Sequence, residues 1–146
     1  MSELGDIQML SISRIGGKNE RIFDKQVFSN EDSIVDLSGK TELPELLDLL
    51  NHAACVISND TGPAHLSIAL ETPTVVIVGG GHFGSFVPYP EEVRPTFARF
   101  AFEDMSCYHC FWRCDRRQSN SEAFPCVSKV SVDTIWNLTK ELLNAD

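Results

Sequence analysis

Short apolar runs of strand length alternate with helical patterns along this chain, and the alternation constrains the fold more than any other feature. Thr74–Val78 is a continuous β-branched run, which is typical of a strand covered on both faces. Cys55–Ser58 is a second apolar run, and Pro63 with the apolar residues after it marks a helix between the two. Because parallel strands need a crossover connection, this order predicts an α/β fold with a parallel sheet and flanking helices.

The remaining expected elements complete the same pattern. Further strands are expected within Ile7–Ile15, Ser33–Leu37 and Thr96–Phe102. Thr41 is expected to cap a helix that ends near residues 51–53, and Ser131 or Asp133 is expected to cap a closing helix. The 146 residues suffice for one domain of ordinary size. We expect a single domain over 1–146, with a sheet core in 1–102, a cysteine-bearing segment in 103–130 and the closing helix in 131–146.

The charge and the apolar content of the chain exclude several classes of partner. Twelve Lys and Arg against twenty-one Asp and Glu give a net charge of −9, so a nucleic acid partner is not expected. The longest apolar stretch is far below the roughly 18 residues of a membrane span. Residues 1–10 carry no basic residue and no long apolar segment, so they do not form a secretory signal. A cytoplasmic protein is the expectation.

The run from Ser58 to His65 joins a predicted strand to a predicted helix through the polar turn Asp60-Thr61-Gly62. The backbone N–H groups of a first helical turn are unpaired and favour phosphate, and ligands of open α/β sheets bind at this edge. The turn is therefore a candidate phosphate site, to which Thr61 and His65 can add donors. The alternative is that Asp60 or Thr61 merely caps the helix. A small hydrolase that uses Ser58, Asp60 and His65 is a further alternative, although the chain has no G-x-S-x-G motif.

Gly79–Gly84 satisfies the spacing G-x-G-x-x-G after a predicted strand. A dinucleotide-binding fingerprint must also open a helix, and the prolines at 88 and 90 argue against one here. We expect a glycine loop in which His82 lies at the same sheet edge as the Ser58–His65 run. Lys40 after Gly39 could reach a phosphate, and Glu20 could accept hydroxyl groups of a ribose or a sugar, or both could be ordinary surface residues.

Four of the five cysteines, Cys107, Cys110, Cys114 and Cys126, lie within twenty residues. Four thiolates can hold a tetrahedral zinc, but the spacing of the second pair does not match a known finger or knuckle. Structural thiols, a metal centre and a disulfide or redox pair therefore stay open. Cys55 lies in a predicted core strand and is expected to serve packing only.

Three stretches together resemble a known family: Asp36–Leu46, Val56–Leu66 and Ala69–Val76. They resemble the donor-binding half of glycosyltransferase family nine, the lipopolysaccharide heptosyltransferases and their relatives. The resemblance runs from about Met9 to the C-terminus, and the cysteine segment is similar to the tail of many members. It implies a Rossmann-like domain, the C-terminal half of a GT-B type glycosyltransferase that faces a second domain across a cleft.

The resemblance also implies roles for particular residues. Asp60, Thr61, Gly62 and His65 would lie at the diphosphate and the sugar of a nucleotide-diphosphate sugar. Lys40, Thr41 and Glu20 would complete the donor site, with Thr41 near the base or ribose. No metal or other cofactor is expected, because amides and side-chain donors can hold the diphosphate.

Two departures from the family limit the expected activity. An N-terminal acceptor domain, which supplies the general base, and the first βα unit of the donor domain are not found in the sequence. We therefore expect no catalytic residue in this chain, an inactive isolated chain and marginal solubility. The expected function is donor binding within an inverting transferase that acts on an acceptor glycan or lipid-linked saccharide in lipopolysaccharide or cell-surface glycan synthesis. The alternative is a catalytically silent interaction module, with zinc on its four cysteines.

Overall fold

The computed structural model describes residues 11–18 and 34–145. They form two compact units that divide between Leu46 and Leu47. The first unit contains β1 (Ile12–Arg14), β2 (Ile34–Asp36) and the start of α2 (Leu43–Asn51). β1 and β2 pair in parallel, with Ile12 opposite Ile34 and Arg14 opposite Asp36. The parallel pairing that the sequence predicts is therefore present in this unit.

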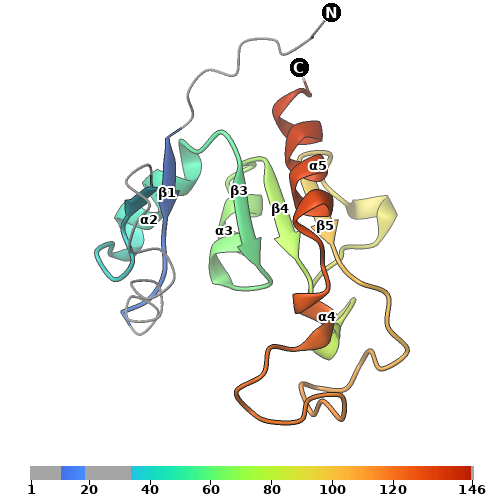
Figure 1. Ribbon diagram of the computed structural model, residues 1–146. Helices are drawn as coiled ribbons and strands as arrows, with labels where there is room; N and C mark the ends of the chain where they lie inside the picture. Colours follow the sequence, from blue (N-terminus) through green and yellow to red (C-terminus); the bar gives the residue numbers. More distant parts are fainter. Residues whose placement is uncertain (1–10, 19–33, 146) are drawn as a thin grey trace, which may run out of the picture. The chain divides into compact units, whose positions relative to one another are not determined.

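The second unit contains a three-stranded parallel sheet in the order β3-β4-β5 (Figure 1). Its strands are β3 (Val56–Asn59), β4 (Thr74–Ile77) and β5 (Ala98–Ala101), and its helices are α3 (Gly62–Ala69), α4 (Pro125–Ser128) and α5 (Val132–Leu143). The α/β fold with a parallel sheet and flanking helices is confirmed. Within residues 11–18 and 34–145, no helix has both the length and the apolar character that a membrane span requires.

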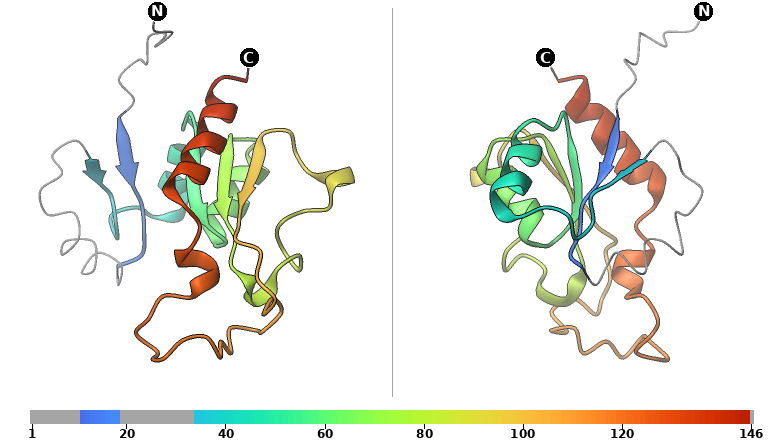
Figure 2. Two further views of the ribbon diagram at one scale, coloured as in Figure 1. Left: turned by 45° about the vertical axis from the view of Figure 1, so that its right-hand side comes forward. Right: turned by 90° about the vertical axis from the view of Figure 1, so that its left-hand side faces the viewer.

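Successive residues of β4 are buried on opposite faces of the sheet. Val76 packs in a cluster with Ala64 and Ile68 of α3, whereas Val75 packs in a cluster with Leu142 of α5. Side chains alternate along a strand, so α3 and α5 cover opposite faces (Figure 2). Burial on both faces of the sheet explains why Thr74–Val78 is a continuous β-branched run in which charged residues do not alternate with apolar ones, as the sequence predicts.

At the starts of α5 and α2, a side chain accepts a hydrogen bond from a nearby backbone N–H group. Ser131 is the N-cap of α5, and its Oγ accepts a hydrogen bond from the N–H of Thr134 at 3.0 Å, which confirms one of the two predicted caps. The prediction of Thr41 as the cap of α2 is wrong by one residue, because the helix begins at Leu43. The N–H of Glu42 donates to Glu45 Oε2 at 2.9 Å, which is half of a capping box.

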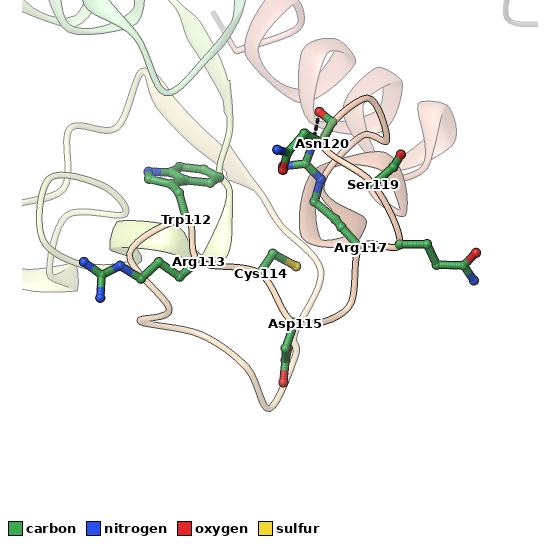
Figure 3. A pocket seen from close by; sticks show the side chains of 8 residues that line it. Trp112, Arg113, Cys114, Asp115, Arg117, Ser119 and Asn120 are labelled. Carbon is green, nitrogen blue, oxygen red and sulfur yellow. Dashed lines mark hydrogen bonds between the residues drawn. The ribbon is translucent and has the colours of Figure 1, made fainter.

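Two long connections leave the carboxyl edge of the sheet. The one after β4 contains the 3₁₀ turns η1 (Gly80–His82) and η2 (Glu91–Val93). The one after β5 runs through the cysteine segment to α4, a short helix that the sequence reading did not predict. A pocket of about 410 Å³ opens in this second connection (Figure 3).

Candidate functional site

The loop from Ser58 to Gly62 connects β3 to α3 at the carboxyl edge of the sheet. β3 ends at Asn59, and the next N–H, that of Asp60, donates to the carbonyl of Ile77 at the end of β4 at 3.1 Å. Thr61 then adopts extended backbone as the N-cap, and α3 begins at Gly62 with Pro63 in its first turn. The hydrogen bond from Asp60 to Ile77 is the last one between the two strands, and the chain turns into α3 directly after it.

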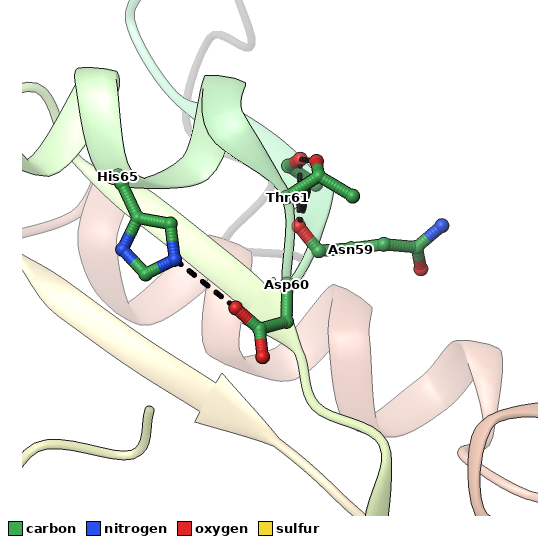
Figure 4. Close-up of polar contacts among 5 residues, drawn as sticks. Asn59, Asp60, Thr61 and His65 are labelled. Carbon is green, nitrogen blue, oxygen red and sulfur yellow. Dashed lines mark hydrogen bonds and ion pairs between the residues drawn. The ribbon is translucent and has the colours of Figure 1, made fainter. Parts of the chain in front are cut away.

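Asp60 and His65 form a pair across this turn. His65 Nε2 lies 3.1 Å from Asp60 Oδ1 (Figure 4). The side chain of Asp60 is 16% exposed and that of His65 is 39% exposed, so the imidazole is partly accessible whereas the carboxylate is mostly covered. When Nε2 carries a proton it donates to Asp60, and the contact fixes the orientation of the imidazole ring. Asp60 keeps its second carboxylate oxygen for another donor.

Thr61 occupies the N-cap position of α3, but neither its side chain nor that of Asp60 makes a cap hydrogen bond. Thr61 makes no side-chain cap bond. Its hydroxyl instead donates to the carbonyl of Asn59 at 3.3 Å and lies 3.3 Å from the hydroxyl of Ser58. Asp60 Oδ1 contacts His65 rather than a backbone N–H of the helix. Both side chains that could have capped the helix are therefore engaged elsewhere.

The start of α3 consequently keeps unsatisfied donors. In the part of the chain that the structure describes, the backbone N–H groups of Thr61 and Gly62 donate to no acceptor. The N–H groups of Ala64 and His65 both donate to the carbonyl of Thr61. Two adjacent free N–H groups at the positive end of a helix favour an anion.

The glycine loop after β4 lies at the same edge and is covered by aromatic rings. A Cβ atom at Gly80 would lie 2.4 Å from the ring of Tyr108, and one at Gly81 would lie 2.4 Å from the indole of Trp112. The N–H groups of His109 and Phe111 donate to the carbonyls of Gly80 and Gly81. Only glycine allows this close approach. The loop opens no α-helix, so the structure agrees that it is not a dinucleotide fingerprint.

The segment that covers the glycine loop has unusual backbone angles. His109, Phe111 and Trp112 have φ of 65°, 50° and 62°, in the left-handed region that residues with a Cβ seldom occupy. Each such residue costs of order 1–2 kcal/mol, so the packing against the glycines must offset the strain. Burial raises the pKa of the Tyr108 phenol to about 12, with smaller contributions from nearby negative groups.

His82 lies beside these aromatic rings. Its imidazole is 5.3 Å from the ring of Phe111 and 6.2 Å from that of Trp112, both in edge-to-face orientation. His82 therefore belongs to an aromatic cluster. Its predicted contact with a ligand stays a prediction.

The structure brings together four of the seven predicted donor residues, namely Asp60, Thr61, Gly62 and His65. Lys40 and Thr41 belong to the first unit, where the Lys40 ammonium donates to the carbonyl of Asp36. Lys40 follows a turn at Gly39, whose φ of 66° and contact with Lys18 require glycine. Glu20 lies outside the described residues. The contribution of these last three donor residues stays a prediction.

The five cysteines are free thiols. Among residues 11–18 and 34–145, which include all five, no three His, Cys, Asp or Glu side chains converge in a way that could hold a metal ion. The zinc alternative receives no support from this arrangement. Cys55 is half-buried beside the α5 cluster, and burial raises the pKa of its thiol, which agrees with a packing role.

Sequence reasoning missed the aromatic cover of the glycine loop. Three consecutive glycines permit another segment to approach closely, and three aromatic residues, Tyr108, Phe111 and Trp112, stand close together among the cysteines. Spacing alone could not pair the two segments, because about thirty residues separate them. The number of aromatic residues in this segment could have indicated that it covers another part of the chain, but no periodic pattern indicated which part.

These features define a class of protein: a parallel α/β unit with free backbone N–H groups in a strand-to-helix loop at its carboxyl edge, the place where nucleotide-binding domains hold their ligand. Residues 14–116 match the family model of glycosyltransferase family 9 (heptosyltransferase). The match covers more than half of the chain. The protein therefore belongs to glycosyltransferase family 9.

Two curated relatives match shorter stretches. Lipopolysaccharide heptosyltransferase 3 of Escherichia coli (strain K12) is 35% identical over 65 residues, which are 44% of this chain and 19% of that protein. Lipooligosaccharide heptosyltransferase 2 of Haemophilus influenzae is 38% identical over 45 residues, which are 31% of this chain and 13% of that protein. The chain thus aligns with only a small part of either relative.

A solved structure shares the fold. The dodecameric iron-containing heptosyltransferase TibC, in complex with ADP-D-β-D-heptose, matches with a TM-score of 0.57 and 23% identity, over 76% of this chain and 31% of that one. The iron belongs to the description of that protein; among the described residues of this chain, no group of three His, Cys, Asp or Glu side chains converges on one point.

Proposed function

We propose that this chain is the donor-binding portion of an inverting, heptosyltransferase-like glycosyltransferase that acts in lipopolysaccharide or cell-surface glycan synthesis. The observation that carries the proposal is the start of α3, where two free backbone N–H groups and the Asp60–His65 pair share one loop. An anion-binding helix start beside hydroxyl-binding side chains suits a nucleotide-diphosphate sugar. Membership of the family is consistent with this ligand.

The loop offers a way to assist departure of the diphosphate. Negative charge grows on the diphosphate oxygens as the bond to the sugar breaks, and donors aimed at that charge lower the barrier. The N–H groups of Thr61 and Gly62 are such donors. Asp60 holds the ring of His65 in one orientation, and its second oxygen can accept a hydrogen bond from a sugar hydroxyl.

The remainder of the reaction belongs to the same proposal. Residues 1–146 act as one partial domain of a GT-B type enzyme without its first βα unit, and Lys40, Thr41 and Glu20 complete the donor site. The general base and the contacts with the acceptor, a glycan or lipid-linked saccharide, come from an N-terminal domain beyond these residues. The isolated chain is then inactive and needs no metal or cofactor. A cytoplasmic location is part of the proposal.

The test is nucleotide binding by the chain itself. Thermal shift and calorimetric titrations with ADP, GDP, UDP and CDP should show selective stabilisation by one nucleotide. At a ligand concentration of about a hundred times Kd, the gain is about 2.7 kcal/mol, which raises Tm by several degrees. His65→Ala and Asp60→Ala should each abolish this gain.

The chain contains a matched control for these variants. His52 and Asp48 form a similar pair at 3.3 Å on α2, but both side chains are more than 70% exposed. His52→Ala should leave nucleotide binding unchanged, since the polar contacts of the His52 ring within the described residues are with Asp48 on the same helix and not with the loop. Equal losses in His52→Ala and His65→Ala, or no response to any nucleotide, contradict the proposal.

A further inference from the structure

Asn59 is the last residue of β3, and its side chain lies on the other face of the sheet from His65. Ser58 pairs with Val76, whose side chain packs against α3. Side chains alternate along a strand, so Asn59 lies on the face where Val75 packs against α5. His65 belongs to α3, which covers the first face. The loop between β3 and α3 therefore begins with a polar side chain on one face of the sheet and ends with one on the other.

The amide group of Asn59 is available to a ligand. The side chain is exposed, and it makes no hydrogen bond with any residue that the structure describes. The backbone carbonyl of Asn59, by contrast, accepts hydrogen bonds from the hydroxyls of Ser58 at 2.9 Å and Thr61 at 3.3 Å. In Figure 4 the amide group extends away from His65. Contacts within the loop thus hold the backbone of Asn59 and leave its side chain free.

The two free N–H groups of the loop, those of Thr61 and Gly62, lie between Asn59 and His65 in the sequence. In open α/β sheets, a ligand with two polar ends lies across the carboxyl edge with its diphosphate at a helix start. A nucleotide-diphosphate sugar is such a ligand, with a nucleoside at one end and a sugar at the other. With the diphosphate at the N–H groups and the sugar toward His65, the nucleoside extends toward Asn59.

The ribose is the part of the nucleoside that Asn59 can reach. The α-carbons of Asn59 and Thr61 are two residues apart in the chain and so at most about 7 Å apart in space. The ribose is bonded directly to the diphosphate, whereas the base lies beyond it. Ribose hydroxyls both donate and accept hydrogen bonds, and the side-chain amide of asparagine does the same. An uncharged amide also adds no repulsion to the nearby diphosphate.

We propose that Asn59 is a specificity-determining residue that binds the ribose hydroxyls of the nucleotide. The inference rests on the proposed function, since a ribose is present only when the loop binds a nucleotide. It adds a contact in the second unit to those predicted for Thr41 and Glu20. Its consequence is a preference for nucleotides that carry both ribose hydroxyls.

The test is a double-mutant cycle between the side chain and the hydroxyls. The parent chain is titrated by calorimetry with ADP, GDP, UDP and CDP, and then with the 2′,3′-dideoxy form of the one that binds. The dideoxy nucleotide should bind the parent chain about fivefold more weakly, the effect of one lost neutral hydrogen bond. Asn59→Ala should weaken binding of the ribonucleotide by a similar factor. The same variant should bind the dideoxy nucleotide as the parent does, within about twofold.

Asn51→Ala is the matched control. Asn51 is also exposed, but it ends α2 and precedes β3, so it lies before the strand whose last residue is Asn59. This variant should change the affinity for either nucleotide by less than about twofold. In thermal denaturation without ligand, Asn59→Ala should have the Tm of the parent chain, which separates a binding effect from a folding effect.

The outcomes separate this inference from the proposed function. If Asn59→Ala weakens both nucleotides equally, or weakens neither, the inference is overturned and the proposed function stands. Equal weakening by Asn51→Ala and Asn59→Ala also overturns the inference. If the parent chain binds none of the four nucleotides, the proposed function is rejected, and the inference is rejected with it.

Discussion

Asp60 and Thr61 are the two residues before α3, where a polar side chain ordinarily accepts a hydrogen bond from the first turn of the helix. His65 instead contacts the Asp60 carboxylate, and the hydroxyl of Thr61 donates to the carbonyl of Asn59. The helix start remains open as a result. At the scale of the residue, the free N–H groups of the loop depend on two side chains that do not form the cap bonds expected from their positions.

Asp36, unlike Asp60, does accept a hydrogen bond from a nearby backbone N–H group. The N–H of Ser38 donates to Asp36 at 2.9 Å, and this bond, more than the nearby Arg14 guanidinium, lowers the pKa of Asp36 to about 2. Since the pKa is lower in the folded state, this stabilisation is present above about pH 4 and is lost as the pH falls toward 2. A carboxyl titration by NMR should place the midpoint of Asp36 near pH 2.

The variant Asp36→Asn removes the titrating group. The free energy of unfolding of this variant should depend less on pH between 4 and 2 than that of the parent chain. An Asp36 midpoint near 4 in the parent, with unchanged pH dependence in the variant, would contradict the prediction.

At the scale of the element, the two N-caps of α3 and α5 differ in a measurable way. Ser131 makes a cap bond and Thr61 does not. Ser131→Ala should therefore lower the free energy of unfolding by about 1 kcal/mol, whereas Thr61→Ala should change it by a few tenths at most. Urea denaturation of the two variants measures the difference. Equal losses would mean that the Thr61 hydroxyl stabilises α3 after all.

The glycine loop gives a second prediction at this scale. Gly80→Ala places a Cβ against the ring of Tyr108 and should destabilise the chain by about 1–3 kcal/mol, the usual range for overpacking. Gly62→Ala is the control, because no atom lies within 4 Å of a Cβ built there. Thermal denaturation of both variants should separate them. Similar stability in the two would show that the aromatic cover moves aside without cost.

The sequence predicted those elements whose patterns are local. Thr74–Val78 revealed a doubly covered strand, and Ser131 marked a helix start, because burial and capping depend on neighbours along the chain. The loop at Asp60–His65 was identified for the same reason. The aromatic cover of Gly79–Gly81 and the pocket were missed, since both depend on contacts between segments that no sequence period relates.

At the scale of the whole molecule, apolar surface remains exposed. In the described residues β3 and β5 are the outer strands of their sheet, and the side chain of Ile57 on β3 is about half exposed. An outer strand with exposed apolar side chains favours association with another chain. Sedimentation velocity should therefore show self-association that increases with concentration, and Ile57→Lys should reduce it. A monodisperse monomer at all concentrations would contradict this prediction.

The double cover of β4 has a consequence for how its alignment with β3 is specified. When a strand is buried on both faces, a shift by one position exchanges one buried side chain for another, so burial alone does not fix the register. In the observed register, backbone hydrogen bonds close the ladder at both ends of the strand pair. The N–H of Val56 donates to the carbonyl of Pro73 at one end, and the N–H of Asp60 donates to that of Ile77 at the other. The loop that would receive the diphosphate is thus also one of the two anchors that align the sheet.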